Sequence, residues 1–221
     1  MKCAAIIVAA GSGTRFKSRI PKPFVLLKRK PLIVHCLTVL ERSITIDGIV
    51  IVGHESCLSR FKTLTKKFKK VITVTSGGMT RSDSVKCGLA ALDATFDHVL
   101  VHDAARPLID EAMLNRVSEA LANSTAVITA VPVKATIKEV DLKKMRVVRT
   151  VPRVSLWEVQ TPQGFKRSLL EKAHAQVFEG EATDDAMLVE HLGVKVKVVM
   201  GDYRNIKITT PEDLRMAKAL C

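Results

Sequence analysis

Short aliphatic runs alternate with helix-like stretches along most of the chain, and this alternation restricts the fold more than any other feature. Residues 3–9 and 48–53 are continuous aliphatic runs that lead into glycine. Such runs are typical of strands buried on both faces. The alternation predicts an α/β fold in which helices cover both faces of a mostly parallel sheet. Further strands are expected over residues 71–75, 98–102, 126–133 and 195–199, and helices over residues 33–42, 58–68, 82–94, 110–123, 168–178, 184–191 and from 211.

The composition fits one domain with an aliphatic core. The chain has 221 residues, of which 47% are hydrophobic and 4% aromatic, so a single domain over residues 1–221 is expected. The five cysteines form no CxxC pair, which argues against a disulfide framework or a structural zinc site and favours a reduced compartment. The apolar run over residues 4–10 is too short for a signal peptide or a membrane span. We therefore expect no membrane association and a cytoplasmic location.

Residues 134–152 depart from the alternation. Residues 135–140 and 145–151 are β-prone, and residues 141–144 form a plausible turn between them. A lone two-stranded hairpin is marginally stable in water. We therefore expect a β-arm that packs against another surface, most simply a second subunit.

Three polar or glycine-rich segments follow predicted strands, over residues 11–15, 77–84 and 103–107. In open α/β sheets the ligand lies beyond the carboxyl ends of the strands. Segments far apart in the sequence are therefore expected to meet at one edge of the sheet and form a site there.

The first segment contains Gly11 and Gly13, which would let backbone N–H groups approach phosphate oxygens. Alone, the pattern favours a plain strand-to-helix turn, and it matches neither the Walker A loop nor the dinucleotide fingerprint. Arg15 follows closely, and Lys22 stands between two prolines that restrict its backbone. Fixed cations beside a phosphate loop are what phosphoryl or nucleotidyl transfer requires.

The second segment breaks its strand with two glycines, of which Gly78 is the second, and then starts a helix near Ser84. It is either a simple helix start or the rim of a site that recognises a base through Ser84 and backbone amides.

The third segment places Asp103 at the end of a buried strand, where a carboxylate could hold Mg²⁺. The preceding His102 could be a metal ligand, but a hydrogen-bonded near-core histidine is the favoured interpretation. Arg106 could bind substrate or brace Asp103, and the sequence leaves these open.

Four further polar residues stand in compact signatures in the second half of the chain, and their side chains could bind a second phosphate. Any one of them alone is more often structural. They are Thr136, Arg153, Thr161 and Lys207.

Together these segments resemble the 2-C-methyl-D-erythritol 4-phosphate cytidylyltransferase family of the non-mevalonate isoprenoid pathway. The shared motifs, in order, are AAGSGTR, PKPF, GGMTRSDSV, VHDAARPL, QTPQGF, TDDA and NIKITTPEDL. The resemblance implies a Rossmann-like nucleotidyltransferase fold, a homodimer with interlocking β-arms, and Mg²⁺. It also implies in-line attack of a methylerythritol phosphate oxygen on the α-phosphorus of CTP, with release of pyrophosphate.

The resemblance also implies roles for single residues. Arg15 and Lys22 would stabilise the transition state, and Asp103 would engage Mg²⁺. Contacts with the nucleotide would come from Gly11, Gly13, Gly78 and Ser84. The acceptor would be positioned by Thr136, Arg153, Thr161 and Lys207, with Arg153 and Lys207 counted among the catalytic groups. Thr136 and Arg153 would reach the neighbouring subunit's site through the arm.

The chain departs from the family pattern in places. Ala135 stands where an Asp is usual before Thr136, and Pro23 stands where Gln is common. With the sequence ending at Cys221, we expect no counterpart of the cyclase domain that is fused to some relatives.

Two alternatives remain open. Ribitol-5-phosphate cytidylyltransferases are similar, but their relatives tend to have Val then Arg-Pro-Phe after His-Asp, whereas this chain has Ala105-Arg106-Pro107-Leu108. The net charge of +13 is compatible with a nucleic-acid-binding protein on an inactive transferase fold. No aromatic stacking motif or helix-turn-helix signature accompanies that charge, so we expect no nucleic-acid partner.

Overall fold

A computed structural model describes residues 2–221 except 12, 14, 15, 17, 19 and 179. Its centre is a seven-stranded sheet with the order β11-β7-β10-β6-β1-β4-β5. All strand pairs are parallel except the two that involve β10, which is antiparallel to both its neighbours. The strands are β1 (Cys3–Ala9), β4 (Gly48–Gly53), β5 (Val71–Ser76), β6 (His98–Asp103), β7 (Ala126–Pro132), β10 (Trp157–Lys166) and β11 (Lys197–Met200).

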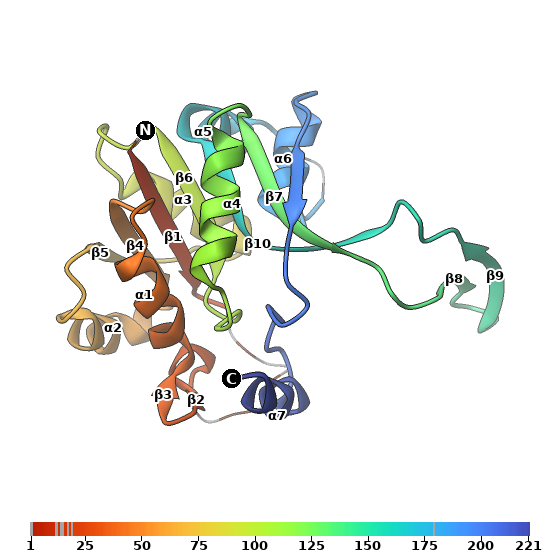
Figure 1. Cartoon of the computed structure of the whole chain (residues 1–221), viewed down its shortest axis with the longest axis horizontal. Coiled ribbons are helices and arrows are strands. Elements are labelled where there is room, and N and C mark those ends of the chain that lie inside the picture. The colour runs from red at the N-terminus through yellow and green to blue at the C-terminus, as the bar shows by residue number, and fades with distance from the viewer. Residues whose placement is uncertain (1, 12, 14–15, 17, 19, 179) are drawn as a thin grey trace.

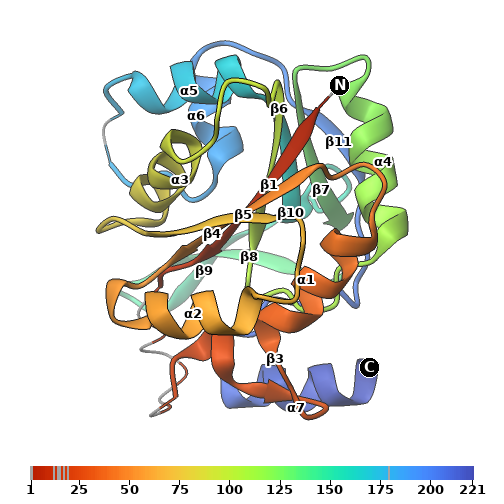
Figure 2. The same cartoon turned by 90° about the vertical axis from the view of Figure 1, so that its left-hand side faces the viewer.

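Helices cover both faces of this sheet, as predicted (Figure 2). On one face α1 (Leu32–Arg42), α2 (Leu58–Thr65) and α4 (Glu111–Leu121) pack over one aliphatic cluster. On the other face α3 (Arg81–Ala90), α5 (Arg167–Ala175) and α6 (Asp185–His191) pack over a second cluster. The last helix, α7 (Pro211–Leu220), lies against the short hairpin of β2 (Leu26–Leu27) and β3 (Lys30–Pro31).

Polar side chains fix where several helices begin. Asp110 and Asp184 accept hydrogen bonds from the backbone N–H of Met113 and Met187, three residues later. Thr80 and Thr210 form reciprocal capping boxes with the aspartates three residues on. Such caps satisfy N–H groups that have no partner inside the helix. The helix that starts after Thr80 is therefore fixed at the edge of the sheet where the glycine-rich segments end.

Strand β10 was not predicted from the sequence, since its QTPQ segment was interpreted only as a polar signature. The strand is buried over Gln160–Phe165, yet three of those residues are polar. Their side chains are satisfied by distant groups: Gln160 donates to Asp202, Gln163 to Asp184, and Thr161 pairs with His102. A polar strand of this kind has neither the alternation nor the apolar run on which strand prediction depends.

The predicted arm is present as an antiparallel hairpin of β8 (Ile137–Asp141) and β9 (Arg146–Val151). Figure 1 shows this hairpin at the end of two extended connecting segments, well away from the rest of the molecule. Several apolar side chains on it are exposed, among them Leu142 at 80% and Val147 at 60%. None of the helices in the described part of the chain is long and apolar enough to cross a membrane.

Gly88 marks a close approach between α3 and the sheet, and it yields a stability prediction. A Cβ at this position would lie 2.6 Å from Ile6 Cγ2 and 3.0 Å from Val52 Cγ2. Overpacking of this kind typically costs about 1–3 kcal/mol, against a gain of about 1 kcal/mol in helix propensity. We expect Gly88→Ala to lower the urea midpoint of unfolding. Lys86→Ala, an exposed change in the same helix, is the control, and an unchanged midpoint for Gly88→Ala would contradict the packing.

Candidate active site

A cleft of about 500 Å³ opens at the carboxyl ends of β1 and β6. The three segments that follow predicted strands meet there, which confirms their expected convergence. Seven of the predicted site residues line it: Gly11, Gly13, Lys22, Gly78, Ser84, Asp103 and Lys207.

The glycine loop and Lys22 lie side by side in this cleft. Gly13 has a φ of +63°, which favours glycine, and a Cβ there would lie 3.4 Å from Lys22 Cβ. Lys22 begins a 3₁₀ turn over Lys22–Phe24, and the buried ring of Phe24 stacks against Phe61 at 4.6 Å between centroids. The backbone of Lys22 is thus fixed by a turn anchored in the core. Arg15, the other cation predicted here, lies outside the described residues.

The second segment packs tightly around the start of α3. A Cβ on Gly78 would lie 2.3 Å from Asp83 Cβ, so the turn requires glycine. Ser84 is buried, and its hydroxyl donates to the Thr80 carbonyl over 3.0 Å. A hydroxyl that donates one hydrogen bond can still accept others. Ser84 therefore lines the cleft as an acceptor rather than as a free donor.

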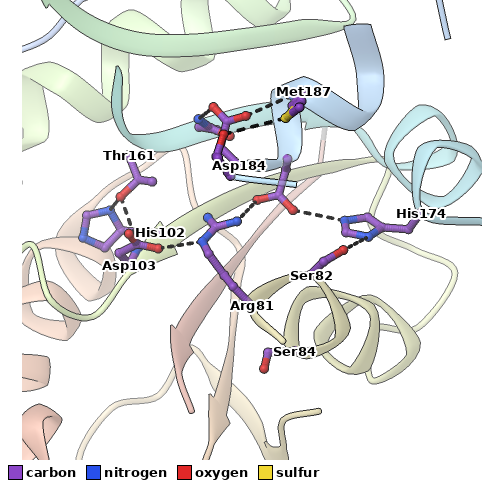
Figure 3. A network of polar contacts seen from close by, with 12 residues as sticks. Arg81, Ser82, Ser84, His102, Asp103, Thr161, His174, Asp184 and Met187 are labelled. Carbon is purple, nitrogen blue, oxygen red and sulfur yellow. Dashed lines mark hydrogen bonds and ion pairs between the residues drawn. The ribbon is translucent and has the colours of Figure 1, made fainter. Parts of the chain in front are cut away.

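Asp103 is the centre of an ion-pair network (Figure 3). Its Oδ1 pairs with Arg81 Nε at 3.2 Å, and its Oδ2 pairs with Lys207 Nζ at 2.7 Å. Burial alone would raise the pKa of the Asp103 carboxyl, but Arg81 and Lys207 outweigh burial and hold that pKa well below its ordinary range. Asp103 is therefore ionised and already neutralised by two cations.

Thr161 lies behind Asp103 rather than in the cleft, which differs from its predicted role as a substrate contact. It is buried, and its Oγ1 accepts a hydrogen bond from the backbone N–H of Asp103 over 3.1 Å. The same hydroxyl lies 3.0 Å from His102 Nδ1. Since its hydrogen-bonding capacity is directed into the protein, the geometry makes Thr161 a support for the Asp103 backbone.

His102 is the hydrogen-bonded near-core histidine that the sequence favoured. It is fully buried, with Nε2 at 3.1 Å from the Arg106 carbonyl and Nδ1 on Thr161. Arg106 is buried as well, and its guanidinium donates to the carbonyls of Asn205 and Val159. The sequence left open whether Arg106 binds substrate or braces Asp103. Its guanidinium instead donates to backbone carbonyls, among them that of Asn205, and so braces the segment that leads to Lys207.

Burial gives His102 a measurable effect on stability. It lowers the pKa of His102 from its ordinary 6.5 to about 4. Between these pH values the unfolded chain binds a proton that the folded protein does not, so the free energy of unfolding falls as pH falls from 6.5 to 4. Over that window we expect a loss of about 3 kcal/mol. His102→Gln should flatten this part of a urea-denaturation pH profile, and a profile equal to that of the wild type would contradict the assignment.

Thr136 and Arg153 are not brought into this cleft. Both are exposed at the base of the arm, and Arg153 donates to the Lys134 carbonyl nearby. Neither lines the cleft of its own chain. Within one chain, the predicted acceptor-binding set is therefore divided among the cleft, which Lys207 lines, the interior behind Asp103, where Thr161 lies, and the arm.

Arg81 is the main residue in the cleft that the sequence analysis did not select. It stands in the GGMTRSDSV motif, between Gly78 and Ser84, and joins Asp103 to the buried Asp185 on α6. The position of Arg81 beside a glycine turn was a signal that could have identified it as a site residue. Its ion pairs could not be predicted, because the two acidic partners are 22 and 104 residues away in the sequence.

Asp103 is the predicted Mg²⁺ ligand, and it is the one carboxylate among the described residues that line the cleft. No group of three or more potential metal-ligating side chains occurs in the described part of the chain. Mg²⁺ is commonly held by one or two carboxylates together with substrate phosphates and water. The residues fit a Mg²⁺ of that kind, provided that the Lys207 pair with Asp103 opens.

Charge that develops on a phosphorus centre and its leaving group is stabilised by preorganised N–H groups and cations, and the cleft places Lys22, Arg81 and Lys207 beside glycines at the ligand-binding edge of the sheet. The fold and site therefore define a nucleotidyltransferase. Residues 3–221 match the 2-C-methyl-D-erythritol 4-phosphate cytidylyltransferase family. The chain belongs to that family, which confirms the resemblance noted in its motifs.

Individual relatives agree with this assignment. The chain is 44% identical to the 2-C-methyl-D-erythritol 4-phosphate cytidylyltransferase of Alkaliphilus metalliredigens, covering 99% of this chain and 92% of the relative. It is 45% identical to the protein of the same name from Dehalococcoides mccartyi, covering 99% and 96%. The crystal structure of 4-diphosphocytidyl-2C-methyl-D-erythritol synthase from Anaerococcus prevotii superposes with a TM-score of 0.87 at 35% identity, covering 99% of this chain and 97% of that one.

Proposed function

We propose that this enzyme transfers the cytidylyl group of CTP to 2-C-methyl-D-erythritol 4-phosphate, giving 4-diphosphocytidyl-2-C-methyl-D-erythritol and pyrophosphate. The observation that carries the proposal is the arrangement of the cleft. Lys22 and the glycine loop lie beside Asp103 and Lys207, so that a triphosphate and a second phosphate have separate cationic partners in one space.

The residues divide the work of an in-line displacement. A phosphate oxygen of the acceptor attacks the α-phosphorus, a new P–O bond forms, and the bond to the pyrophosphate oxygen breaks. The backbone N–H groups of Gly11 and Gly13 would contact the triphosphate, and Lys22, with Arg15, would stabilise charge on the α-phosphate and the departing pyrophosphate. Lys207 binds the acceptor's phosphate, and Gly78 and Ser84 form the nucleotide rim.

The proposal includes Mg²⁺, which would bind together with CTP. Asp103 would be its protein ligand, with the remaining ligands from triphosphate oxygens and water. When bound, the ion would neutralise the triphosphate and favour departure of pyrophosphate.

A homodimer with exchanged arms would complete the site. Arg153 and Thr136 lie outside their own cleft, and the arm that carries them exposes apolar side chains such as Val147 and Val148, at 60% and 59%. Exposed apolar groups on a projecting hairpin favour burial against a partner. In the proposed dimer each arm brings Arg153 and Thr136 to the acceptor end of the partner's cleft. The cytoplasmic location stays a prediction.

An assay of pyrophosphate release tests the reaction. The purified enzyme, CTP and Mg²⁺ are combined with 2-C-methyl-D-erythritol 4-phosphate or, in parallel, with ribitol 5-phosphate. Turnover of the methylerythritol substrate supports the proposal. Turnover of ribitol 5-phosphate alone would show that ribitol 5-phosphate is the acceptor. RNA binding with a steep salt dependence but no pyrophosphate release would indicate a nucleic-acid-binding protein instead of a transferase.

A further inference from the structure

Arg81 lies between two aspartates and is fixed mainly from the interior side. Its Nη1 donates to Asp185 Oδ2 over 2.7 Å, and its Nε donates to Asp103 Oδ1 over 3.2 Å. Asp185 is only 1% exposed, and its other oxygen lies 3.1 Å from His174 Nε2. Figure 3 shows this chain of contacts leading from His174 to Arg81 and on to Asp103. The Arg81 guanidinium is thus oriented from the interior by Asp185, which does not line the cleft.

Lys207 holds Asp103 from the opposite side. Its ammonium lies 2.7 Å from Asp103 Oδ2, and its side chain is 39% exposed, against 21% for Arg81. The backbone next to it is fixed, because the N–H of Ile208 donates to the Ala105 carbonyl over 2.8 Å. Lys207 is therefore the more accessible of the two cations, on a flexible stem that can turn from Asp103 towards a ligand.

The charges explain why both cations are needed. Asp103 is 9% exposed, and a carboxylate this deeply buried is costly without a counter-ion. If Lys207 were its only protein partner, moving Lys207 to a substrate phosphate would leave Asp103 without a counter-ion from the protein, dependent on the Mg²⁺ that enters with CTP. With Arg81 in place, Asp103 keeps one counter-ion when Lys207 leaves, so Lys207 can be used for binding.

We propose that Arg81 is a positioning residue that remains on Asp103 as its permanent counter-ion and thereby releases Lys207 to bind the acceptor's phosphate. This inference rests on the proposed function, in which Lys207 binds that phosphate. Arg81 acts through Lys207, and Asp185 acts by keeping Arg81 in place.

A double-mutant cycle tests the coupling. Steady-state constants for both substrates are measured for the wild type, Arg81→Gln, Lys207→Ala and the double variant. We expect Arg81→Gln to raise the acceptor KM on the order of tenfold while the CTP KM changes by about twofold or less. In the Lys207→Ala background the same change should cost about twofold or less, because coupled residues are non-additive. Equal losses in both backgrounds would overturn the proposal and indicate that Arg81 acts independently of Lys207.

Additional variants keep the test independent of folding. If Arg81→Gln does not fold, Asp185→Asn removes the anchor while keeping the arginine's charge, and it should raise the acceptor KM in the same direction by a smaller factor. An Asp185→Asn enzyme that folds with unchanged acceptor KM would contradict the proposal. Arg167→Gln, at an arginine paired with Glu171 outside the cleft, is the matched control and should leave both KM values unchanged.

The outcomes also separate this inference from the function on which it rests. A wild-type enzyme that does not use the methylerythritol substrate refutes the proposed function. A Lys207→Ala enzyme with unchanged acceptor KM refutes the assignment of Lys207, and the role of Arg81 with it. An acceptor KM that responds to Lys207→Ala but not to Arg81→Gln refutes the inference alone.

Discussion

Replacing Lys22 by Ala should lower kcat by on the order of 10²-fold or more, because the cleft then loses a fixed charge that acts on the transition state. The fold holds this lysine in place: it begins a 3₁₀ turn whose Phe24 is 1% exposed in the core. A group positioned in advance does not have to be reoriented as charge develops on phosphorus. The loss should therefore be larger in kcat than in the KM for CTP.

Lys62→Ala is the matched control for this prediction. Lys62 is exposed on α2 and does not line the cleft, so the control removes the same charge from the protein's overall field. Both variants should unfold at the same urea concentration as the wild type. If Lys22→Ala retained its kcat, or if Lys62→Ala lost as much, stabilisation by a fixed local charge would be the wrong explanation.

The parts of the site that could be predicted are those in which local sequence and topology agree. Gly13 needs a left-handed backbone, Asp103 ends a buried strand, and both positions follow from their neighbours in the chain. The rule that ligands bind beyond the carboxyl ends of strands then brought separate segments together. The sheet and its helices could be predicted for the same reason, because hydrophobic periodicity and glycine breaks indicated the same element boundaries.

The parts that could not be predicted depend on tertiary contacts. Thr161 was assigned to the substrate because of the family resemblance, although its polar motif alone favoured a structural role, and its hydroxyl is directed to the backbone of Asp103, 58 residues away. β10 escaped notice because its polar side chains are satisfied by groups from other elements. A sequence pattern reports what a side chain can bond to, and only the fold decides which partner it meets.

The arm was predictable from the sequence in one respect and not in another. Its hairpin was predictable from two β-prone runs and a turn, yet the sequence pattern alone does not say whose cleft the arm completes. In the structure Arg153 stands at the base of an arm that projects from the body of its own chain (Figure 1). A variant of Arg153 and a mixture of variant chains distinguish action in its own site from action in a partner's site.

Arg153→Ala should mainly raise the KM for 2-C-methyl-D-erythritol 4-phosphate, by tenfold or more on the scale of about 1.5–3 kcal/mol for a hydrogen bond to a charged group. The KM for CTP should change little, since the triphosphate's partners remain. Arg149→Ala, which removes an exposed arginine paired with Glu139 on the same hairpin, controls for general damage to the arm. A variant in which only the CTP KM moved would show that Arg153 does not serve the acceptor.

Mixed dimers then decide which site Arg153 serves. If it acts in the partner's cleft, a dimer of one Lys22→Ala chain and one Arg153→Ala chain has one site with both defects and one with neither. At an acceptor concentration well below the KM of the Arg153→Ala enzyme, where each single variant has little activity, equal co-expression should restore about a quarter of wild-type activity, because about half of the proposed dimers are mixed and each has one intact site of two. Lys22 and Lys207 line one cleft of one chain, so Lys22→Ala mixed with Lys207→Ala creates no intact site and should show no recovery. Recovery absent from both mixtures would place Arg153 in its own chain's site and remove the arm exchange from the mechanism.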